Sequence, residues 1–434
     1  MELQFRQTLE KGSADFGSLP DEHQPFSVFQ PFGECVDLLD VIGPDLHLMA
    51  SKLSEAFEQP KRVVVIVQDR NLHEVRSITG GLAMKRLQSV VLLLVSSPVW
   101  AKSPTVTITP LGARTGEFCQ VDRALLFQDP TGVRILYDAG RTVAGSDDRR
   151  LGDVHVVLLT HVHADHLGDV KLAQDPDDPS SSCGGDLRTS PTLPYSNVAE
   201  IAVGKNSAVL VSADVSTFLA NKIASLRGVP TPSCAAGSEV LVPRSEPCTS
   251  NIGFGAKRTV TMQAGTPGVR ITVVHAEHGN GLDPAFLIGP ERENLASNGL
   301  LAPMGPALGY VLSFSNGLTV YLTGDTSQTS DMATIVRDYY APKLVVFNIG
   351  DIFTTGPEEA AFAATALLDP QAVIPEHANE VATRNGQVIP GTKTARFIEM
   401  IGKLPAYPPL SGRTMQFDGD GNCVSGCGAK RAHR

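Results

Sequence analysis

The run Thr160-His161-Val162-His163-Ala164-Asp165-His166-Leu167-Gly168-Asp169 decides the fold of this chain. It directly follows an aliphatic stretch that predicts a buried strand, and its histidines and first aspartate are ligands that zinc prefers. Alternate residues of an extended segment point the same way, so His161 and His163 are expected to face one metal. The turn that follows presents Asp165 and His166 to a neighbouring point, so one short run is able to serve two metals.

The composition excludes several classes of protein. The chain has 434 residues, 42% of them hydrophobic and 19% charged, as is typical of a globular protein. With 36 basic and 46 acidic side chains the net charge is −10, which gives no long-range attraction to nucleic-acid phosphates. We therefore expect no nucleic-acid partner. No apolar run reaches the roughly 18 residues of a bilayer-spanning helix, so no integral membrane segment is expected. The oligomeric state is left open.

From residue 102 onward, aliphatic runs alternate with helical patterns, which predicts an α/β layered domain. The predicted strands are Val133 to Asp138, Val154 to Thr160, Ala208 to Ser212, Val269 to His275, Tyr310 to Ser315, Thr319 to Thr323, Lys343 to Asn348 and Ala372 to Pro375. The predicted helices are Asp214 to Leu226, Asp331 to Tyr339, Pro357 to Leu368 and Thr392 to Ile401. Two stretches rich in turn-forming residues, 174 to 195 and 279 to 308, are interpreted as insertions, and we expect the second to cover the substrate.

Residues 84 to 101 have the features of an export signal. Met84-Lys85-Arg86 supplies a basic start, Val90 to Val95 is a short apolar run, and Val99-Trp100-Ala101 ends in a small residue. This order is typical of a bacterial secretory signal peptide cut after Ala101, although the apolar run alone also fits a buried strand. We therefore predict a signal peptide and a periplasmic or secreted protein.

The position of this signal divides the chain. Translation is then expected to begin at Met84, so that residues 1 to 83 are an upstream segment absent from the working protein. That segment carries scattered charges and no chemistry-bearing cluster. The alternative is a small N-terminal domain. On the first interpretation the working domain is residues 102 to 434.

Cysteine usage agrees with export. Residues 102 to 434 contain six of the seven cysteines, an even number that permits disulfides in an exported protein. The pairs closest in sequence, Cys234 with Cys248 and Cys423 with Cys427, are the first expectation. The alternative is that these residues are buried free thiols. Neither pair has the spacing of a structural zinc site.

The pattern HxHxDH resembles that of the metallo-β-lactamase superfamily, and the rest of the superfamily pattern follows in order. Ile271 to Gly279 supplies a further histidine, Val320 to Thr326 an aspartate, and Val373 to Asn379 a last histidine. Upstream, Leu136 to Gly140 resembles the strand whose aspartate, here Asp138, braces the ligands. The resemblance spans about residues 105 to 390.

Within the superfamily, the chain looks most like the ascorbate-6-phosphate lactonase-like branch of metal-dependent hydrolases. The stretches that carry this likeness are Gly324-Asp325-Thr326, Asn348 to Thr354 and Ile374 to His377. The chain departs from the branch at Ala378, where a tyrosine is usual, and at Gly279, where a serine is common. These differences lie near the metal, so the substrate of the branch does not carry over.

The resemblance implies an αββα sandwich and a binuclear site with two Zn²⁺ ions, other divalent metals such as Mn²⁺ being alternatives. The expected ligands of the first ion are His161, His163 and His278, those of the second are Asp165, His166 and His377, and Asp325 bridges the two. Asp165 and Asp325 are the catalytic candidates, since Asp165 is able to orient or relay a proton. A metal-bridging hydroxide would attack a lactone, phosphoester or sulfate ester of a small molecule.

Three alternatives stay open. His275 competes with His278 as third ligand, although its place on the strand beside Ile271 and Val273 favours a core or supporting position. A di-iron oxidoreductase is a second alternative, but such relatives replace the second histidine of the motif with glutamate, whereas His163 is intact. The third is a metal-binding member of the fold without turnover.

Overall fold

The computed structural model describes residues 27–29, 35–37, 103–234 and 237–428. The chain divides into two units, Met1–Ser97 and Pro98–Arg434. In the first unit, β1 (Ser27–Phe29) pairs with β2 (Cys35–Asp37) in antiparallel fashion. The signal peptide at residues 84 to 101 and the start at Met84 lie outside the described residues and stay predictions.

The second unit is built on two β-sheets. One sheet, here called the β17 sheet, has the spatial order β10 (Glu239–Leu241), β12 (Lys257–Thr261), β13 (Val269–His275), β16 (Leu308–Ser313), β17 (Thr319–Leu322), β18 (Leu344–Asn348) and β19 (Ala372–Glu376). The other, the β6 sheet, has the order β11 (Cys248–Asn251), β9 (Ala208–Val211), β6 (Val156–Leu158), β5 (Arg134–Tyr137), β4 (Leu125–Gln128), β3 (Val106–Pro110), β22 (Met415–Phe417) and β23 (Cys423–Ser425).

Apolar side chains that alternate between the two faces of each strand produce the layers. In β18, Leu344 and Val346 belong to a core cluster that contains side chains of both sheets, whereas Val345 and Phe347 face a second cluster with helices. Side chains of one strand alternate between its two faces, so each sheet is apolar on both sides. The helices that cover the sheets are α4 (Asn197–Lys205) and α5 (Ala213–Arg227) on the β6 sheet, and η2 (Met332–Tyr340), α7 (Pro357–Phe362), η3 (Ala363–Leu368) and α8 (Lys393–Met400) on the β17 sheet.

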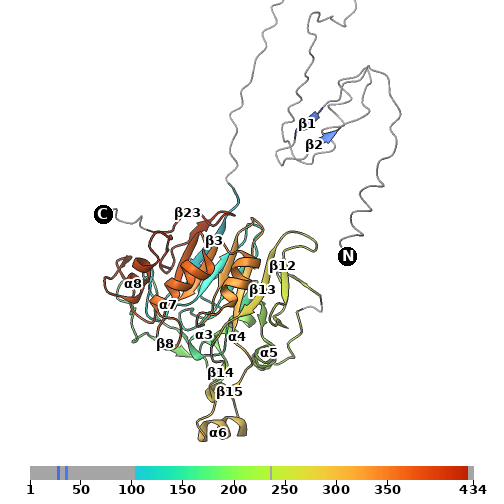
Figure 1. Cartoon of the computed structure of the whole chain (residues 1–434). Helices are drawn as coiled ribbons and strands as arrows, with labels where there is room; N and C mark the ends of the chain where they lie inside the picture. The colour runs from blue at the N-terminus through green and yellow to red at the C-terminus, as the bar shows by residue number, and fades with distance from the viewer. Residues whose placement is uncertain (1–26, 30–34, 38–102, 235–236, 429–434) are drawn as a thin grey trace, which may run out of the picture. The chain divides into compact units, whose positions relative to one another are not determined.

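These layers confirm the expected αββα sandwich (Figure 1). The eight predicted strands are present with somewhat different ends, and β13 has the bounds that its sequence predicts. The predicted helix from Pro357 to Leu368 is corrected in part, because its second half continues as the π-helical η3. Among the described residues, no helix has both the length and the apolar character that crossing a membrane requires.

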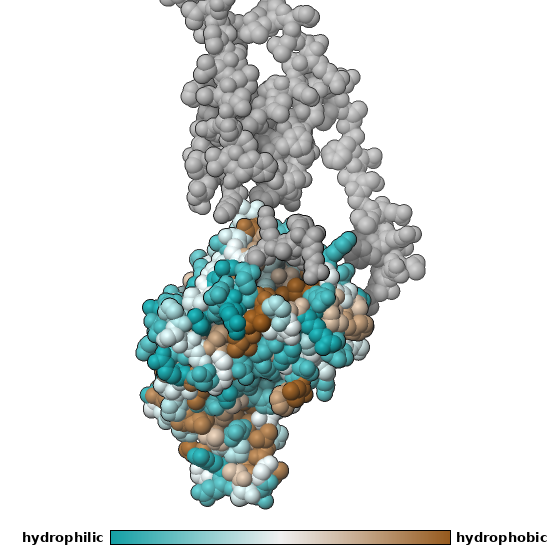
Figure 2. Space-filling model, turned by 90° about the vertical axis from the view of Figure 1, so that its left-hand side faces the viewer, coloured by the Kyte–Doolittle hydropathy of each residue, from teal (hydrophilic) through white to brown (hydrophobic). Residues whose placement is uncertain are grey.

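The insertion at residues 279 to 308 forms a projecting arm, defined here as residues 281–303. Its elements are β14 (Gly281–Leu282), the 3-10 helix η1 (Pro284–Phe286), α6 (Pro290–Ser297) and β15 (Ala302–Pro303). β14 pairs with β15 at the base, and α6 lies at the far end (Figure 1). Leu282 and Phe286 are buried in the cluster that contains α5, whereas α6 has no buried residue. Figure 2 shows hydrophobic and hydrophilic residues side by side at this lower end.

The six cysteines of the second unit form three disulfides. Cys234–Cys248 and Cys423–Cys427 confirm the pairing expected from the sequence. The third, Cys119–Cys183, joins the other insertion, residues 174 to 195, to the segment before β4. That insertion is not wholly irregular, because β8 (Thr189–Pro191) pairs with β7 (Val170–Leu172).

Candidate metal centre

The expected ligands follow strands whose ends meet at one edge of the sandwich. In the β17 sheet, β13 and β17 are both antiparallel to β16, and β19 runs parallel to β17 through β18. Their carboxyl ends therefore lie at the same edge, where His278, Asp325 and His377 follow them. His161 follows β6 of the other sheet, and the short helix α3 (Ala164–Leu167) begins three residues later.

Two hydrogen bonds join the sheets beside this edge. The backbone N–H of Leu308 donates to Thr160 O at 2.9 Å, and the hydroxyl of the buried Tyr310 donates to Leu159 O at 2.8 Å. Both acceptors directly precede His161. The end of β6 is thus fixed against β16 at the place where the ligand candidates of the two sheets must meet.

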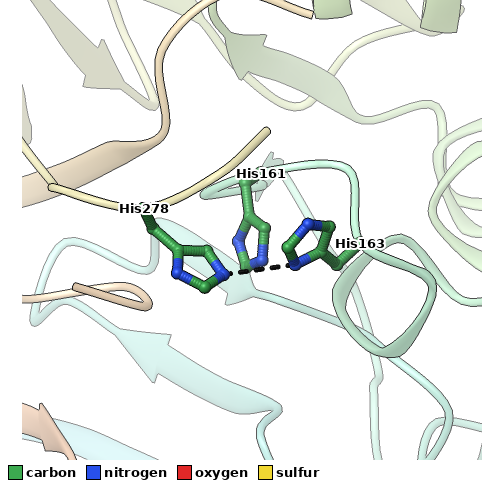
Figure 3. A group of neighbouring side chains, drawn as sticks. All are labelled: His161, His163 and His278. Carbon is green, nitrogen blue, oxygen red and sulfur yellow. Dashed lines mark hydrogen bonds between the residues drawn. The ribbon is translucent and has the colours of Figure 1, made fainter. Parts of the chain in front are cut away.

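The first group consists of His161, His163 and His278 (Figure 3). Their ring nitrogens lie within 4.8 Å of one another, and His278 Nε2 is 3.2 Å from His163 Nδ1. Burial lowers the pKa of all three imidazoles, and positive neighbours lower the pKa of His161 further. The rings are therefore neutral near pH 7, which is the form that binds metals.

The second group consists of Asp165 and His166, both on α3, together with His377. Their ligand atoms also lie within 4.8 Å of one another, and His377 Nε2 is 3.4 Å from Asp165 Oδ2. Burial opposes the charge of Asp165, but Arg123 and then His166 hold the pKa of its carboxyl well below the usual range.

Asp325 lies between the two groups. Its Oδ2 atom is 3.9 Å from His161 Nε2 and 3.7 Å from His278 Nε2 on one side. On the other side it is 3.5 Å from His166 Nε2 and 3.2 Å from His377 Nε2. A single carboxylate oxygen thus faces both groups, which is the position that a bridging ligand requires.

The donor set fits metal ions. Within the described part of the chain, Nε2 of His161, His166 and His377 are buried atoms without a hydrogen-bond partner. Such groups are rare in folded proteins, because a buried unpaired polar atom costs about 1–3 kcal/mol. A cation between these nitrogens and the carboxylates would satisfy them together. The residues present therefore suit borderline divalent metals.

Asp138 braces the second group from behind. Its carboxylate accepts hydrogen bonds from Thr160 N at 2.9 Å and Thr160 Oγ1 at 2.8 Å, and Oδ2 lies 2.8 Å from His166 Nδ1. This contact turns the Nε2 side of the His166 ring toward Asp325. A carboxylate behind a histidine in this way fixes both its tautomer and its orientation.

His275 lies outside both groups. Its Nε2 atom is 3.1 Å from Glu277 Oε2, and its ring meets Phe254 edge-on at 5.3 Å. The geometry therefore brings His278, and not His275, into the cluster. The notion that His275 points into the core is wrong, because its side chain is about one-third exposed, at 34%.

Backbone geometry around the cluster is demanding. Gly324 has φ +62°, and a Cβ there would lie 2.7 Å from Leu308 O, so the residue before Asp325 needs to be glycine. His377 itself has φ +50°, a conformation that few residues other than glycine adopt. Strain of this kind is typical of functional sites, where the surrounding structure holds it in place.

Two residues near the cluster have no signal in the sequence. Arg123 is buried beside Asp165, with Nη2 2.5 Å from Asp165 Oδ2. Asn280 accepts a hydrogen bond from Val162 N at 2.9 Å, between the first two histidines of the motif. Both side chains reach the site only through the tertiary fold.

Comparison with known proteins identifies the family of this chain. The Metallo-beta-lactamase superfamily profile matches residues 123–214. A UPF0173 metal-dependent hydrolase of Roseiflexus castenholzii is 30% identical over 256 residues, which cover 58% of this chain and 77% of that protein. Another, from Polynucleobacter asymbioticus, is 27% identical over 273 residues, covering 63% and 73% of the respective chains.

A solved structure with a similar arrangement is that of Igni18, described as a novel metallo hydrolase from Ignicoccus hospitalis. It is 19% identical with a TM-score of 0.45, and the match covers 72% of this chain and 99% of that one. The family assignment depends instead on the sequence relatives and the superfamily profile. The chain belongs to the UPF0173 metal-dependent hydrolases of the metallo-β-lactamase superfamily.

Proposed function

We propose that residues 102–434 form a binuclear zinc-dependent hydrolase that cleaves an ester-type bond of a small molecule. The observation that carries this proposal is the position of Asp325 Oδ2, within 4 Å of imidazole nitrogens from both ligand groups. One zinc is assigned to His161, His163 and His278 and the other to Asp165, His166 and His377, with Asp325 as bridge. The buried unpaired Nε2 atoms support this assignment.

When bound, two divalent cations would supply a water molecule of lowered pKa and positive charge opposite the developing oxyanion. The protein positions the reactants around them. Asp165 is the more exposed of the two carboxylates in the cluster, at 27% against 5% for Asp325, so it is the one that a substrate would meet first. Asp165 is therefore assigned to orient the attacking water by accepting its hydrogen bond, and Asp325 to hold the two groups together. The scissile bond of a lactone, phosphoester or sulfate ester fits this chemistry.

Metal analysis combined with a substrate panel tests the proposal. Purified protein should contain about two zinc ions per chain and hydrolyse at least one activated lactone, phosphodiester or sulfate ester. Asp325→Ala should remove that turnover. Iron together with oxygen consumption would instead support a di-iron oxidoreductase, which the intact His163 disfavours. Bound metal without turnover across the panel would support a non-catalytic member of the fold.

We also propose that the protein is exported after cleavage behind Ala101. Pairing of all six cysteines in the second unit supports this, because disulfides persist in oxidising compartments. Expressed from Met84 in a Gram-negative host, the protein should appear in the periplasm or medium with Lys102 at its N-terminus. A cytoplasmic protein that keeps residues 84–101 at its N-terminus would contradict export.

A further inference from the structure

The two ligand groups differ in the charge that surrounds them. The first group is made of three imidazoles. The second contains Asp165, which pairs with Arg123. Among the described residues, Arg123 is the only lysine or arginine that forms an ion pair with either of the two proposed ligand carboxylates, Asp165 and Asp325. A metal in the second group would therefore have a fixed positive neighbour that a metal in the first group lacks.

Arg123 contacts the oxygen that faces the other ligands. Its Nη2 atom is 2.5 Å from Asp165 Oδ2, and the same Oδ2 is 3.4 Å from His377 Nε2 and 3.9 Å from His166 Nε2. A metal held by these two histidines would have to share Oδ2 with the guanidinium group. The ion pair thus competes directly with the second metal.

The guanidinium group of Arg123 has little freedom to move away from Asp165. The Arg123 side chain is only 4% exposed, and Nη2 also donates to Asn379 Oδ1 at 3.0 Å. The position of the preceding residue, Asp122, is also fixed, because its carboxylate accepts 2.8 Å hydrogen bonds from Ala113 N and Cys119 N. Arginine keeps its proton even when buried, so the competing charge is permanent.

We infer that Arg123 makes the two metal positions unequal, so that the His161–His163–His278 position fills first and the Asp165 position binds its metal more weakly. The inference rests on the proposed binuclear function. Like charges a few ångströms apart repel strongly where water is excluded, and Asp165 already has a partner before the metal arrives. Occupancy of the second position would then follow the ambient zinc concentration, and activity would rise with it. Arg123 is a positioning residue in this scheme, since it acts through Asp165.

Stepwise metal binding tests the inference. Metal-free protein would be titrated with Zn²⁺ against a chromophoric chelator, as wild type and as Arg123→Met, which keeps the bulk and removes the charge. Wild type should bind in two steps whose Kd values differ by about tenfold or more. In Arg123→Met the weaker step should tighten by about tenfold or more, as expected when a nearby like charge is removed, while the tighter step stays unchanged.

Three further variants complete the test. Arg227→Met removes an arginine that pairs with Glu246 at 2.8 Å, far from the ligands in the fold, and should leave both steps unchanged. Arg123→Lys keeps the charge and should keep the two steps apart. If Arg123→Met fails to fold by circular dichroism, Asn379→Ala serves instead. This substitution removes the hydrogen bond from Arg123 to Asn379, so that Asp165 remains as the partner of Nη2. The weaker zinc-binding step should then become weaker still.

The outcomes separate this inference from the proposed function. Equal affinities in a wild-type protein that binds two metals and turns over substrate would overturn the inference alone. A weaker or lost second step in Arg123→Met would also overturn it, because Arg123 would then assist binding. A wild-type protein that takes up only one metal at saturating zinc would instead overturn the binuclear function.

Discussion

One ligand candidate, His278, lies just before the arm in the chain, yet the ligand cluster and the arm are built in opposite ways. The cluster gathers residues from four stretches of sequence and from both sheets, and most of its side chains are buried. The arm is one continuous stretch whose far end, α6, has no buried residue. In the cluster, each side chain contacts others from distant segments, so one change disturbs several. In the arm, contacts beyond its base are local.

The surfaces differ in the same way. At the tip of the arm, Ile288, Leu300 and Leu301 are each more than half exposed. Because exposed side chains contribute little to a core, we expect substitutions at the tip of the arm to disturb the fold less than substitutions in the cluster. Chemistry and selectivity would then be separable in this protein.

The largest effect is expected for Asp325→Ala. The carboxylate faces both ligand groups, so its loss should lower bound metal and reduce turnover by about a hundredfold to a thousandfold, as loss of a central electrostatic group does. The fold should persist, because the side chain lies at a strand end. Metal analysis, activity and circular dichroism measure the three effects. Normal turnover with two bound metals would show that the bridge is wrongly assigned.

The next largest effect is expected for His278→Ala, compared with the same substitution at the neighbouring His275. His278→Ala removes a ring from the first group and should cost one metal and nearly all turnover. His275→Ala is the matched control, since that ring contacts Glu277 and Phe254 instead. It should keep both metals and most activity. The opposite result in metal analysis would transfer the ligand role to His275.

A smaller effect on metal affinity and activity is expected for a substitution of Asp138, which lies behind the ligand His166. Asp138→Asn keeps the size of the side chain but removes the charge that faces His166 Nδ1 at 2.8 Å. Loss of such a partner typically costs about 10–100-fold in metal affinity or activity. The loss should fall mainly on the metal of the second group. An unchanged zinc titration would mean that the charge of Asp138 does not act on the second group.

The smallest effect on the cluster should come from the arm. Replacing residues 288–300 by a short Gly-Ser linker leaves β14, η1 and β15 in place and should change neither zinc affinity nor folding. If the tip covers the substrate, as the sequence predicts, KM should rise severalfold with kcat nearly constant, the pattern of lost uniform binding. Unaltered KM would remove the tip from substrate recognition. Altered zinc binding would show that the arm also acts on the ligand cluster.

What the sequence predicts depends on how local each signal is. The HxHxDH ligands are adjacent in the chain, and their chemistry is visible without a structure. Buried strands such as β18 are visible as aliphatic runs. By contrast, β3 was missed, because its threonines alternate with Val106 and Ile108 and break the run. The helix α4 was missed as well, although Ser196 caps it by accepting from Ala199 N at 3.1 Å.

Arg123 could not be found from the sequence at all. It is a single arginine in a segment without a motif. Its partner Asp165 lies on α3, about 40 residues further along the chain. Only the three-dimensional arrangement gives it a role. The same holds for Asn280, whose contact with Val162 crosses from one sheet to the other. Residues that modify a site are harder to predict than residues that define it.

The Cys119–Cys183 link also bears on how the protein is handled. It ties the insertion at residues 174 to 195 to the short segment that leads to Arg123, and Cys119 N additionally donates to Asp122. Protein made in a reducing cytosol would lack this link, and the guanidinium group would be less firmly held against Asp165. Batches of identical sequence but different oxidation would then differ in zinc content and specific activity. A count of free thiols therefore belongs beside every metal analysis of this enzyme.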